Sequence, residues 1–264
     1  MQSCKQREQS CQLILAIKYK HMNNHEERIQ KFIANNSSIS RRQAENLIEQ
    51  GEVLINGTVA KIGQKISPTI DIVTINEQEI TSYQEEITIA YNKPRGIIVS
   101  KRDPQKRKTI YDDISKEYDH LVHIGRLDKE SEGILLLTTN GELCYRLTHP
   151  RYNIEKEYLV HVSGIPDKAV LSKILNGIQV DDIFIKPSNI HIENITEDGS
   201  SILRLTLTEG RKREIRRLIK HLGFNVKMLQ RIRIGNILLA DLKNKKIKKL
   251  STEKINVLKQ MVGL

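Results

Sequence analysis

A run of four branched apolar residues at 134–137 (ILLL) follows a charged loop near the middle of the chain and constrains the fold more than any other segment. Such a run, bounded by Gly133 and Thr138, is typical of a strand that is buried in a sheet. Further strands are predicted at 87–91, 157–162, 201–208 and 225–233, and helices near 141–147, 167–176 and 211–222. This alternation predicts one folded domain over residues 87–264.

A smaller module precedes that domain. Ile29, Phe32 and Ile33 recur at helical spacing, and Ser40 followed by Gln43 is the capping-box pattern that begins a second helix. The Asn56-Gly57 pair predicts a hairpin between two short strands. Two short helices and a small sheet over residues 22–80 leave little room for chemistry, so this module is expected to bind rather than to catalyse.

Two segments lie outside these domains. Residues 1–21 contain an apolar stretch that is too short for a secretion signal, and they are predicted to be a disordered extension or a misassigned start before Met22. Residues 81–86 belong to a polar, acidic stretch and are predicted to be a linker.

Positive charge is concentrated in one part of the chain. Residues 205–264 carry 16 Lys and Arg against 4 Asp and Glu, while the whole chain of 264 residues has a net charge of +11. A concentrated basic excess is typical of proteins that bind a polyanion such as a nucleic acid. A lysine-rich tail that only aids solubility explains the charge alone equally well.

Several classes of protein are excluded or lose support. No apolar run approaches the ~18–20 residues of a membrane span, so no membrane partner is expected. Three cysteines without a CxxC pair indicate a reducing compartment, and we expect a cytoplasmic protein. Phosphate-binding, dinucleotide-binding and zinc-protease motifs do not occur, and the eight histidines lack metal-ligand spacing, so no cofactor or metal is expected.

The loop before the buried run carries the most informative candidate, Asp128 in Gly125-Arg126-Leu127-Asp128. A carboxylate held at the mouth of a core strand can act as a nucleophile or general base, and a nearby arginine keeps it ionised. The same residues are typical of a turn in which Asp128 pairs with Arg126, and spacing alone favours that interpretation. Tyr158, at the start of a predicted strand, is by itself typical of a core tyrosine.

The segment 209–221 (EGRKREIRRLIKH) predicts an amphipathic helix with a basic face opposite an apolar one. Arg216 lies at the edge of the basic face, where a guanidinium can reach a buried carboxylate, whereas Arg213, Arg217 and Lys220 are expected to meet phosphates. A solvated amphipathic helix is the commoner meaning of such a pattern.

Two other basic groups are candidates for contact with a nucleic-acid backbone. One is the loop 101–108, which is predicted to be exposed, and the other belongs to the N-terminal module. Their members are Lys101, Arg102, Lys106, Arg107 and Lys108 in the loop, and Arg28, Arg41, Arg42 and Lys61 in the module.

Four segments together resemble the pseudouridine synthases of the RsuA/RluB/RluF group, in that family's order and approximate spacing. They are NKPRGIIVSKRDPQKRKTIYD, HIGRLDKESEGILLLTTNGEL, EKEYLV and LTEGRKREIRR. Residues 22–80 resemble the alpha-L RNA-binding domain, first described in a ribosomal small-subunit protein, which usually precedes this catalytic domain. The resemblance covers nearly all of the chain from Met22 onward and turns the interpretation of Asp128 from a turn residue into a functional one.

The resemblance implies an α+β fold in which a mostly antiparallel mixed sheet is flanked by helices. It also implies isomerisation of uridine to pseudouridine in structured RNA, with Asp128 as nucleophile and Tyr158 packed on a flipped base. The basic residue beside the aspartate matches best at Arg216, with Arg213 as the second choice. Members often have glutamine where this chain has Glu214, so the role of that carboxylate stays open.

The resemblance also implies a partner, a stem-loop of ribosomal RNA, and Arg126 is expected to join the RNA-binding residues. Residues 141–170 are more similar to the RluB-like members, which act on large-subunit RNA, although a small-subunit target stays open. A non-catalytic assembly factor on the same scaffold is the main alternative. An RNA methyltransferase would need a glycine-rich loop that is absent from the sequence. A monomer is expected by default.

Overall fold

The computed structural model describes residues 26–37, 39–81 and 86–264. The chain divides into two compact units, with the division between Glu85 and Glu86. The extension predicted at residues 1–21 lies outside the described residues, as does most of the predicted linker. Within the described ranges, no helix has the length and apolar character needed to cross a membrane.

The first unit contains two short helices, α2 (Ile29–Asn36) and α3 (Arg41–Glu49), and two small sheets. Strands β3, β2, β5 and β6 form one sheet in that order, and β1 pairs with β4 in the other. The strand bounds are β1 Glu27–Arg28, β2 Val53–Ile55, β3 Thr58–Val59, β4 Lys65–Ile66, β5 Val73–Ile75 and β6 Gln78–Glu79.

Local sequence signals account for this unit. The Ser40 hydroxyl accepts a hydrogen bond from the Gln43 backbone N–H at 3.3 Å, and the Gln43 side chain accepts one from the Ser40 N–H at 3.0 Å, which confirms the predicted capping box. Asn56 and Gly57 have φ of 52° and 79°, so the predicted hairpin turn is confirmed as well. The predicted helix face is buried, with Ile29, Phe32 and Ile33 at most 2% exposed.

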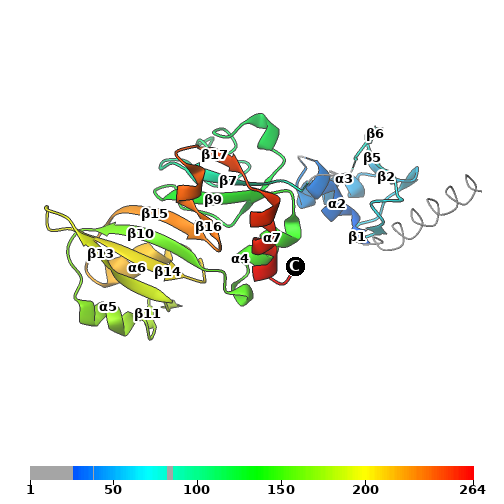
Figure 1. The fold of residues 1–264 in the computed structure, drawn as a ribbon. Helices are drawn as coiled ribbons and strands as arrows, with labels where there is room; N and C mark the ends of the chain where they lie inside the picture. Colours follow the sequence, from blue (N-terminus) through cyan, green and yellow to red (C-terminus); the bar gives the residue numbers. More distant parts are fainter. Residues whose placement is uncertain (1–25, 38, 82–85) are drawn as a thin grey trace, which may run out of the picture. The chain divides into compact units, whose positions relative to one another are not determined.

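The second unit is built on a mixed, nine-stranded sheet (Figure 1). Its main path runs β13-β14-β10-β15-β9-β7-β17, with β16 beside β15 and β8 beside β9. The pairing of β15 with β9 is parallel and the other pairings are antiparallel, so the predicted sheet type is confirmed. The bounds are β7 Thr88–Lys93, β8 Val122–Ile124, β9 Glu132–Thr138, β10 Lys156–Val162, β13 Asn189–Ile195, β14 Ser201–Leu207, β15 Val226–Ile234, β16 Ile237–Leu238 and β17 Ile247–Lys249.

Strand β9 is buried on both faces, as its continuous apolar run requires. Leu135 and Leu137 pack into one hydrophobic cluster, whereas Ile134 and Leu136 pack into a second cluster on the other face. All four side chains are fully buried. The loop that enters β9 therefore starts from a rigid base.

Helices cover the sheet on both sides. On one side α4 (Gly141–Thr148) and α7 (Thr252–Met261) pack over β7 and β9. On the other side α5 (Lys168–Ile174) and α6 (Glu214–His221) pack over β10 and β14, and in Figure 1 α6 lies behind these strands. A separate hairpin contains β11 (Ile178–Val180) and β12 (Ile183–Ile185). Short 3-10 turns occupy η1 Lys116–Tyr118, η2 Pro150–Tyr152 and η3 Leu239–Leu242.

Two segments differ from or refine the sequence predictions. The helix predicted from residue 211 begins only at Glu214, because Arg213 has a φ of 53° and cannot continue a right-handed helix. The lysine-rich run at 243–249 ends in β17 at the border of the sheet. Lysine at a sheet edge discourages pairing with other chains.

Candidate active site

A cavity of about 640 Å³ opens in the second unit, between the loop that precedes β9 and the segment that precedes α6. Asp128 and Tyr158 both line it, from elements 30 residues apart in sequence. The remaining wall combines apolar side chains of the sheet with the segment 209–213, which is basic at 211–213. The structure thus brings two of the three predicted catalytic residues to one hollow.

Lys93 anchors the loop that carries Asp128. Its ammonium group is fully buried at the end of β7 and donates hydrogen bonds to three backbone carbonyls, those of Pro94 at 3.0 Å, Asp128 at 3.2 Å and Ser131 at 2.7 Å. Burial lowers the pKa of Lys93 to about 8, while the nearby carboxylates, Asp128 first among them, oppose that shift. A buried cation therefore holds the backbone of the loop that carries Asp128.

Arg216 holds the same loop from the side of α6. Its Nη2 donates to the Glu130 carbonyl at 2.8 Å and lies 3.3 Å from the Ser131 hydroxyl. Burial lowers the pKa of Arg216, with Arg213 contributing in the same direction and Asp128 opposing both. The charge of Arg216 thus interacts with that of Asp128, while its hydrogen bonds are made to Glu130 and Ser131.

Arg213 and Arg216 occupy different positions relative to the cavity. Arg213 lines the cavity that contains Asp128, and both arginines line a neighbouring basic hollow of about 460 Å³ together with Lys220. The left-handed backbone at Arg213 turns the chain at this point. Arg213, the second choice from the family resemblance for the basic residue beside the aspartate, therefore lies on the cavity wall.

Tyr158 is carried by β10, and its side chain is only 7% exposed. Its cross-strand partners are Leu205 on β14 and Arg231 on β15. Opposite residues of an antiparallel pair lie on the same face, so the ring is flanked by an aliphatic side chain and a guanidinium. The ring belongs to the hydrophobic cluster beneath α6, which fixes it as part of the cavity wall.

Glu214, the departure from the family pattern, is 4% exposed and lines the cavity from the first turn of α6. Its Oε2 accepts a hydrogen bond from the Arg211 backbone N–H at 3.0 Å. Burial raises the pKa of this carboxyl. Since a glutamine oxygen would accept the same bond, its visible role is to hold the segment before α6.

The basic residues proposed to bind RNA fall into two groups, those paired within the protein and those exposed. Arg217 forms ion pairs with Asp181 at 2.9 Å and with Asp182, both in the turn between β11 and β12. Arg126, Arg213 and Lys220 are exposed. Of the four basic residues at 213, 216, 217 and 220, two are therefore exposed, Arg213 just before α6 and Lys220 within it.

The basic residues of the loop 101–108 are exposed as predicted, except Lys101, but two of the exposed ones are paired within the protein. Arg107 pairs with Asp103 at 2.7 Å and Lys108 with Asp113 at 3.0 Å. Lys101 is half-buried, with its Nζ 5.8 Å from the centroid of the Tyr111 ring, and burial lowers its pKa. The two remaining basic residues, Arg102 and Lys106, are exposed.

In the first unit, the four candidate RNA-binding residues are all exposed. Arg41 and Arg42 begin α3, Arg28 lies in β1, and Lys61 follows β3. The apolar positions of α3 face inward at Ala44 and Ile48. The amphipathic pattern of the sequence therefore separates a buried face from a basic one.

Sequence reasoning missed two buried cations near the cavity, Lys93 and Arg231, and a half-buried one, Lys156. Lys156 donates to the Ile154 carbonyl at 2.9 Å and the Thr208 carbonyl at 3.0 Å, and burial lowers its pKa to about 8. For Lys93 and Lys156 the available signal was placement at a strand end, whereas Arg231 lies inside β15. Across the part of the chain that the structure describes, no group of His, Cys, Asp and Glu side chains is arranged to hold a metal ion.

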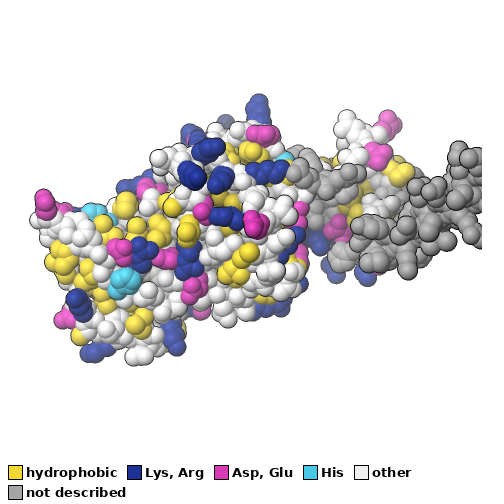
Figure 2. Space-filling view, in the orientation of Figure 1, with side chains coloured by type: hydrophobic (Ala, Val, Ile, Leu, Met, Phe, Trp, Pro, Cys, Tyr) yellow, Lys and Arg dark blue, Asp and Glu magenta, His cyan; other side chains and the backbone are white. Residues whose placement is uncertain are grey.

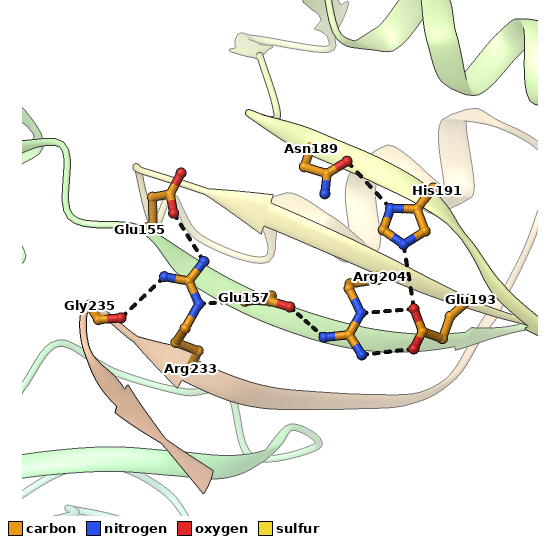
Figure 3. Close-up of polar contacts among 8 residues, drawn as sticks. All are labelled: Glu155, Glu157, Asn189, His191, Glu193, Arg204, Arg233 and Gly235. Atoms are coloured by element: carbon orange, nitrogen blue, oxygen red, sulfur yellow. Dashed lines mark hydrogen bonds and ion pairs between the residues drawn. The ribbon is translucent and has the colours of Figure 1, made fainter. Parts of the chain in front are cut away.

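The opposite face of the same strands carries a network of ion pairs (Figure 3). Arg233 bonds Glu157 at 2.6 Å and Glu155 at 3.0 Å, and Arg204 joins Glu157 to Glu193. Acidic, basic and histidine side chains lie next to one another in this region of the surface (Figure 2). The charged side chains of this network are therefore paired with one another.

Two family models match this chain. The family of RNA pseudouridylate synthases matches residues 87–221, and the S4 domain matches residues 27–69. The chain belongs to the RNA pseudouridylate synthase family, so it is an isomerase that acts on RNA, and the RNA-binding S4 domain occupies its N-terminal unit. The predicted family and α+β fold are confirmed.

Individual relatives cover most of the chain. An "uncharacterized RNA pseudouridine synthase" of Aquifex aeolicus is 39% identical over 90% of this chain and 96% of its own length. The ribosomal large subunit pseudouridine synthase B of Bacillus subtilis is 36% identical over 78% of this chain and 84% of its own length. A crystal structure of a pseudouridylate synthase matches with a TM-score of 0.61 and 30% identity, over 88% of this chain and 99% of that one.

Proposed function

We propose that this pseudouridine synthase isomerises one specific uridine of large-subunit ribosomal RNA, with Asp128 as the nucleophile and the target uridine flipped into the cavity. One observation carries the proposal: Asp128 and Tyr158 line the same cavity, and Lys93 and Arg216 fix the loop of Asp128 from two sides. A volume of about 640 Å³ lies within the ~300–1,000 Å³ typical of small-ligand sites. The name of the Bacillus subtilis relative supports the large subunit as the target.

The chemistry needs few groups. The bond between C1′ of the ribose and N1 of uracil breaks, the base turns while it stays bound, and a bond forms between C1′ and C5. The C5 proton leaves and N1 ends with a proton, so no group is donated and no oxidant is needed. Asp128 attacks the base or the sugar, or stabilises a charged intermediate, and Tyr158 packs on the base and assists removal of the C5 proton.

Arg216 keeps the Asp128 loop in place, and its positive charge is attracted to the Asp128 carboxylate. Arg213, on the cavity wall, is available for the same electrostatic role or for a phosphate of the target. The protein acts as a monomer in the cytoplasm, without a metal ion or cofactor.

The basic surface holds folded RNA while the base is extruded. Flipping a nucleotide costs a few kcal/mol, which phosphate contacts offset. The exposed members make the first contacts, namely Arg102, Lys106, Arg126, Arg213 and Lys220 in the synthase unit and Arg28, Arg41, Arg42 and Lys61 in the S4 unit. Lys101, Arg107, Lys108 and Arg217 exchange contacts within the protein for RNA phosphates.

Tritium release tests this function. The purified protein is incubated with unmodified large-subunit or small-subunit ribosomal RNA, each labelled with tritium at C5 of uridine. We expect release equivalent to one uridine per large-subunit RNA and none from small-subunit RNA. Release from small-subunit RNA alone would contradict the target, and no release from either RNA would favour a non-catalytic assembly factor.

A further inference from the structure

We propose that Arg231 is a further catalytic residue, whose guanidinium binds a carbonyl oxygen of the flipped uracil and stabilises the negative charge that forms on the base. This inference rests on the proposed function of the same cavity. It deepens that function by assigning the group that receives the charge of the leaving base.

The guanidinium of Arg231 is buried and incompletely bonded. Its side chain is 3% exposed and lines the cavity, and Nε donates to the Ile134 carbonyl at 2.8 Å. Nη2 is buried and has no hydrogen-bond partner among the described residues. A buried charged donor without an acceptor costs free energy, so such groups point to a ligand that completes the bonding.

A β-bulge turns Arg231 toward the cavity. Tyr158 pairs with Arg231, but the adjacent Glu157 pairs with Arg233, so Ile232 is an extra residue in β15. An extra residue breaks the normal alternation of side chains along a strand. Arg231 therefore shares the face of Tyr158, while Arg233, two positions along, joins the network on the opposite face.

The close approach of β9 to β15 also helps to fix the position of Arg231. Gly133 pairs in parallel with Arg231, and a Cβ at Gly133 would lie 2.2 Å from the Arg231 carbonyl oxygen. Only glycine allows this approach, which brings the Ile134 carbonyl within reach of Nε. The bond to Ile134 holds the guanidinium beside the Tyr158 strand and leaves Nη2 for another acceptor.

The depth of the site favours a base over a phosphate as the acceptor. Arg231 lies in the sheet beside Tyr158, whose ring we assign to packing on the base, so its guanidinium meets the edge of that base. Exposed arginines that line the same cavity, Arg126 and Arg213, are placed for phosphates. A uracil carbonyl offers an in-plane lone pair that suits a guanidinium N–H.

Each route for Asp128 moves electrons onto the base. If the carboxylate attacks C1′, the electron pair of the broken C1′–N1 bond stays on uracil and spreads over its carbonyl oxygens. If the carboxylate attacks C6, the charge passes through C5 to O4. In both cases a preorganised donor in a buried site stabilises the charge more than water does.

The test measures single-turnover pseudouridine formation by the full-length protein, with Arg231→Gln and Arg231→Lys as variants and Arg233→Gln as the control on the opposite face. We expect Arg231→Gln to slow the chemical step by about 10²–10³-fold, the effect of removing one oxyanion donor, with RNA affinity nearly unchanged. Arg231→Lys retains part of the rate, and Arg233→Gln retains the wild-type rate.

Sulfur-substituted RNA separates contact with the base from a purely structural role. The target uridine is replaced by 2-thiouridine or 4-thiouridine, since sulfur is a weaker hydrogen-bond acceptor than oxygen. One of the two substitutions should slow the wild-type protein and Arg231→Lys but leave the rate of Arg231→Gln unchanged. If Arg231→Gln does not fold, the wild type and Arg231→Lys still give the comparison.

Two results would overturn the role of Arg231 while leaving the proposed function intact. One is an active wild type with an equally active Arg231→Gln, and the other is equal slowing of all proteins by both sulfur substitutions. A wild type that forms no pseudouridine in any ribosomal RNA would instead overturn the proposed function, and this inference with it.

Discussion

Arg231 and Arg233 lie two residues apart in one strand, yet their environments are opposite. Arg233, on the outer face, bonds Glu155, Glu157 and the Gly235 carbonyl (Figure 3). Arg231, on the cavity face, has one backbone partner and a buried Nη2 with none in the described chain. Cations whose bonding is complete stabilise the sheet, whereas an incompletely bonded cation in the cavity that also contains Asp128 is available to a substrate.

The outer network shows what complete pairing does to charge. Hydrogen bonds from Arg204 lower the pKa of Glu193 to about 2. At Glu157, burial acts to raise the pKa, but bonds from Arg233 and Arg204 outweigh it and lower the pKa. These carboxylates stay ionised at neutral pH, as a structural network requires.

The largest expected effect comes from a substitution at Gly133, where the backbones of β9 and β15 approach each other closely. In Gly133→Ala the new Cβ would lie 2.2 Å from the Arg231 carbonyl oxygen, so β9 and β15 must move apart. We expect a loss of roughly 3–5 kcal/mol in the free energy of unfolding, because close packing and a φ of 102° both oppose alanine. Urea denaturation measures it.

Gly199→Ala is the matched control for that substitution. Gly199 also has a positive φ, of 73°, but a Cβ there would meet no atom within 4 Å. The loss of unfolding free energy in Gly199→Ala therefore measures the backbone strain alone. Equal losses in the two variants would contradict the claim that contact between β9 and β15 is what requires glycine at 133.

The next effect concerns the buried anchor of the Asp128 loop. Lys93→Met removes the donor of three backbone carbonyls, and we expect a destabilisation of about 2–4 kcal/mol, since each unsatisfied buried acceptor costs ~1–3 kcal/mol and loss of the buried charge offsets part of this. Pseudouridine formation should fall at least tenfold in protein that is still folded by its thermal melt, with RNA affinity unchanged. A folded variant with the wild-type rate would show that Asp128 does not need this anchor.

A smaller effect is expected on the outer face. Arg233→Gln removes the ion pairs to Glu155 and Glu157, and we expect a loss of about 1–2 kcal/mol in stability, because the pairs are only partly buried. Pseudouridine formation at a temperature where the variant is folded should match the wild type. A large drop in rate with little change in stability would abolish the distinction between the two faces.

The smallest effect is a pH dependence at Glu214. Burial raises the pKa of this carboxyl above its ordinary 4.5. Ionisation of Glu214 therefore destabilises the folded protein as the pH rises through and beyond 4.5. Glu214→Gln removes that penalty and keeps an acceptor for the Arg211 N–H. The melting temperature of Glu214→Gln should exceed that of the wild type more at pH 8 than at pH 5, and an excess that shrinks as pH rises would contradict the assignment.

Local patterns predicted much of the fold. The apolar run at 134–137, the capping box of Ser40 and the Asn56-Gly57 turn each depend on neighbouring residues, and each formed as predicted. The helix start at 211 was wrong, because Arg213 adopts a left-handed conformation that the helical pattern of the sequence does not predict.

The site was only partly predictable. Motif resemblance selected Asp128 and Tyr158, and the cavity contains both. Lys93 was not singled out, since nothing near it in sequence shows that its ammonium will meet the carbonyls of residues 128 and 131. Arg231 was missed because alternation places it with Arg233, and the bulge that separates them arises from pairing with β10.

The central proposal is that Asp128 is the nucleophile, in a cavity whose other residues hold its loop, pack on the base and stabilise the charge that forms on it. Asp128→Asn tests it most directly, because the side chain keeps its shape and loses its nucleophilic charge. Pseudouridine in large-subunit ribosomal RNA is quantified in a single turnover, together with RNA affinity. We expect no product from Asp128→Asn at unchanged affinity, and product formation at the wild-type rate would contradict the claim.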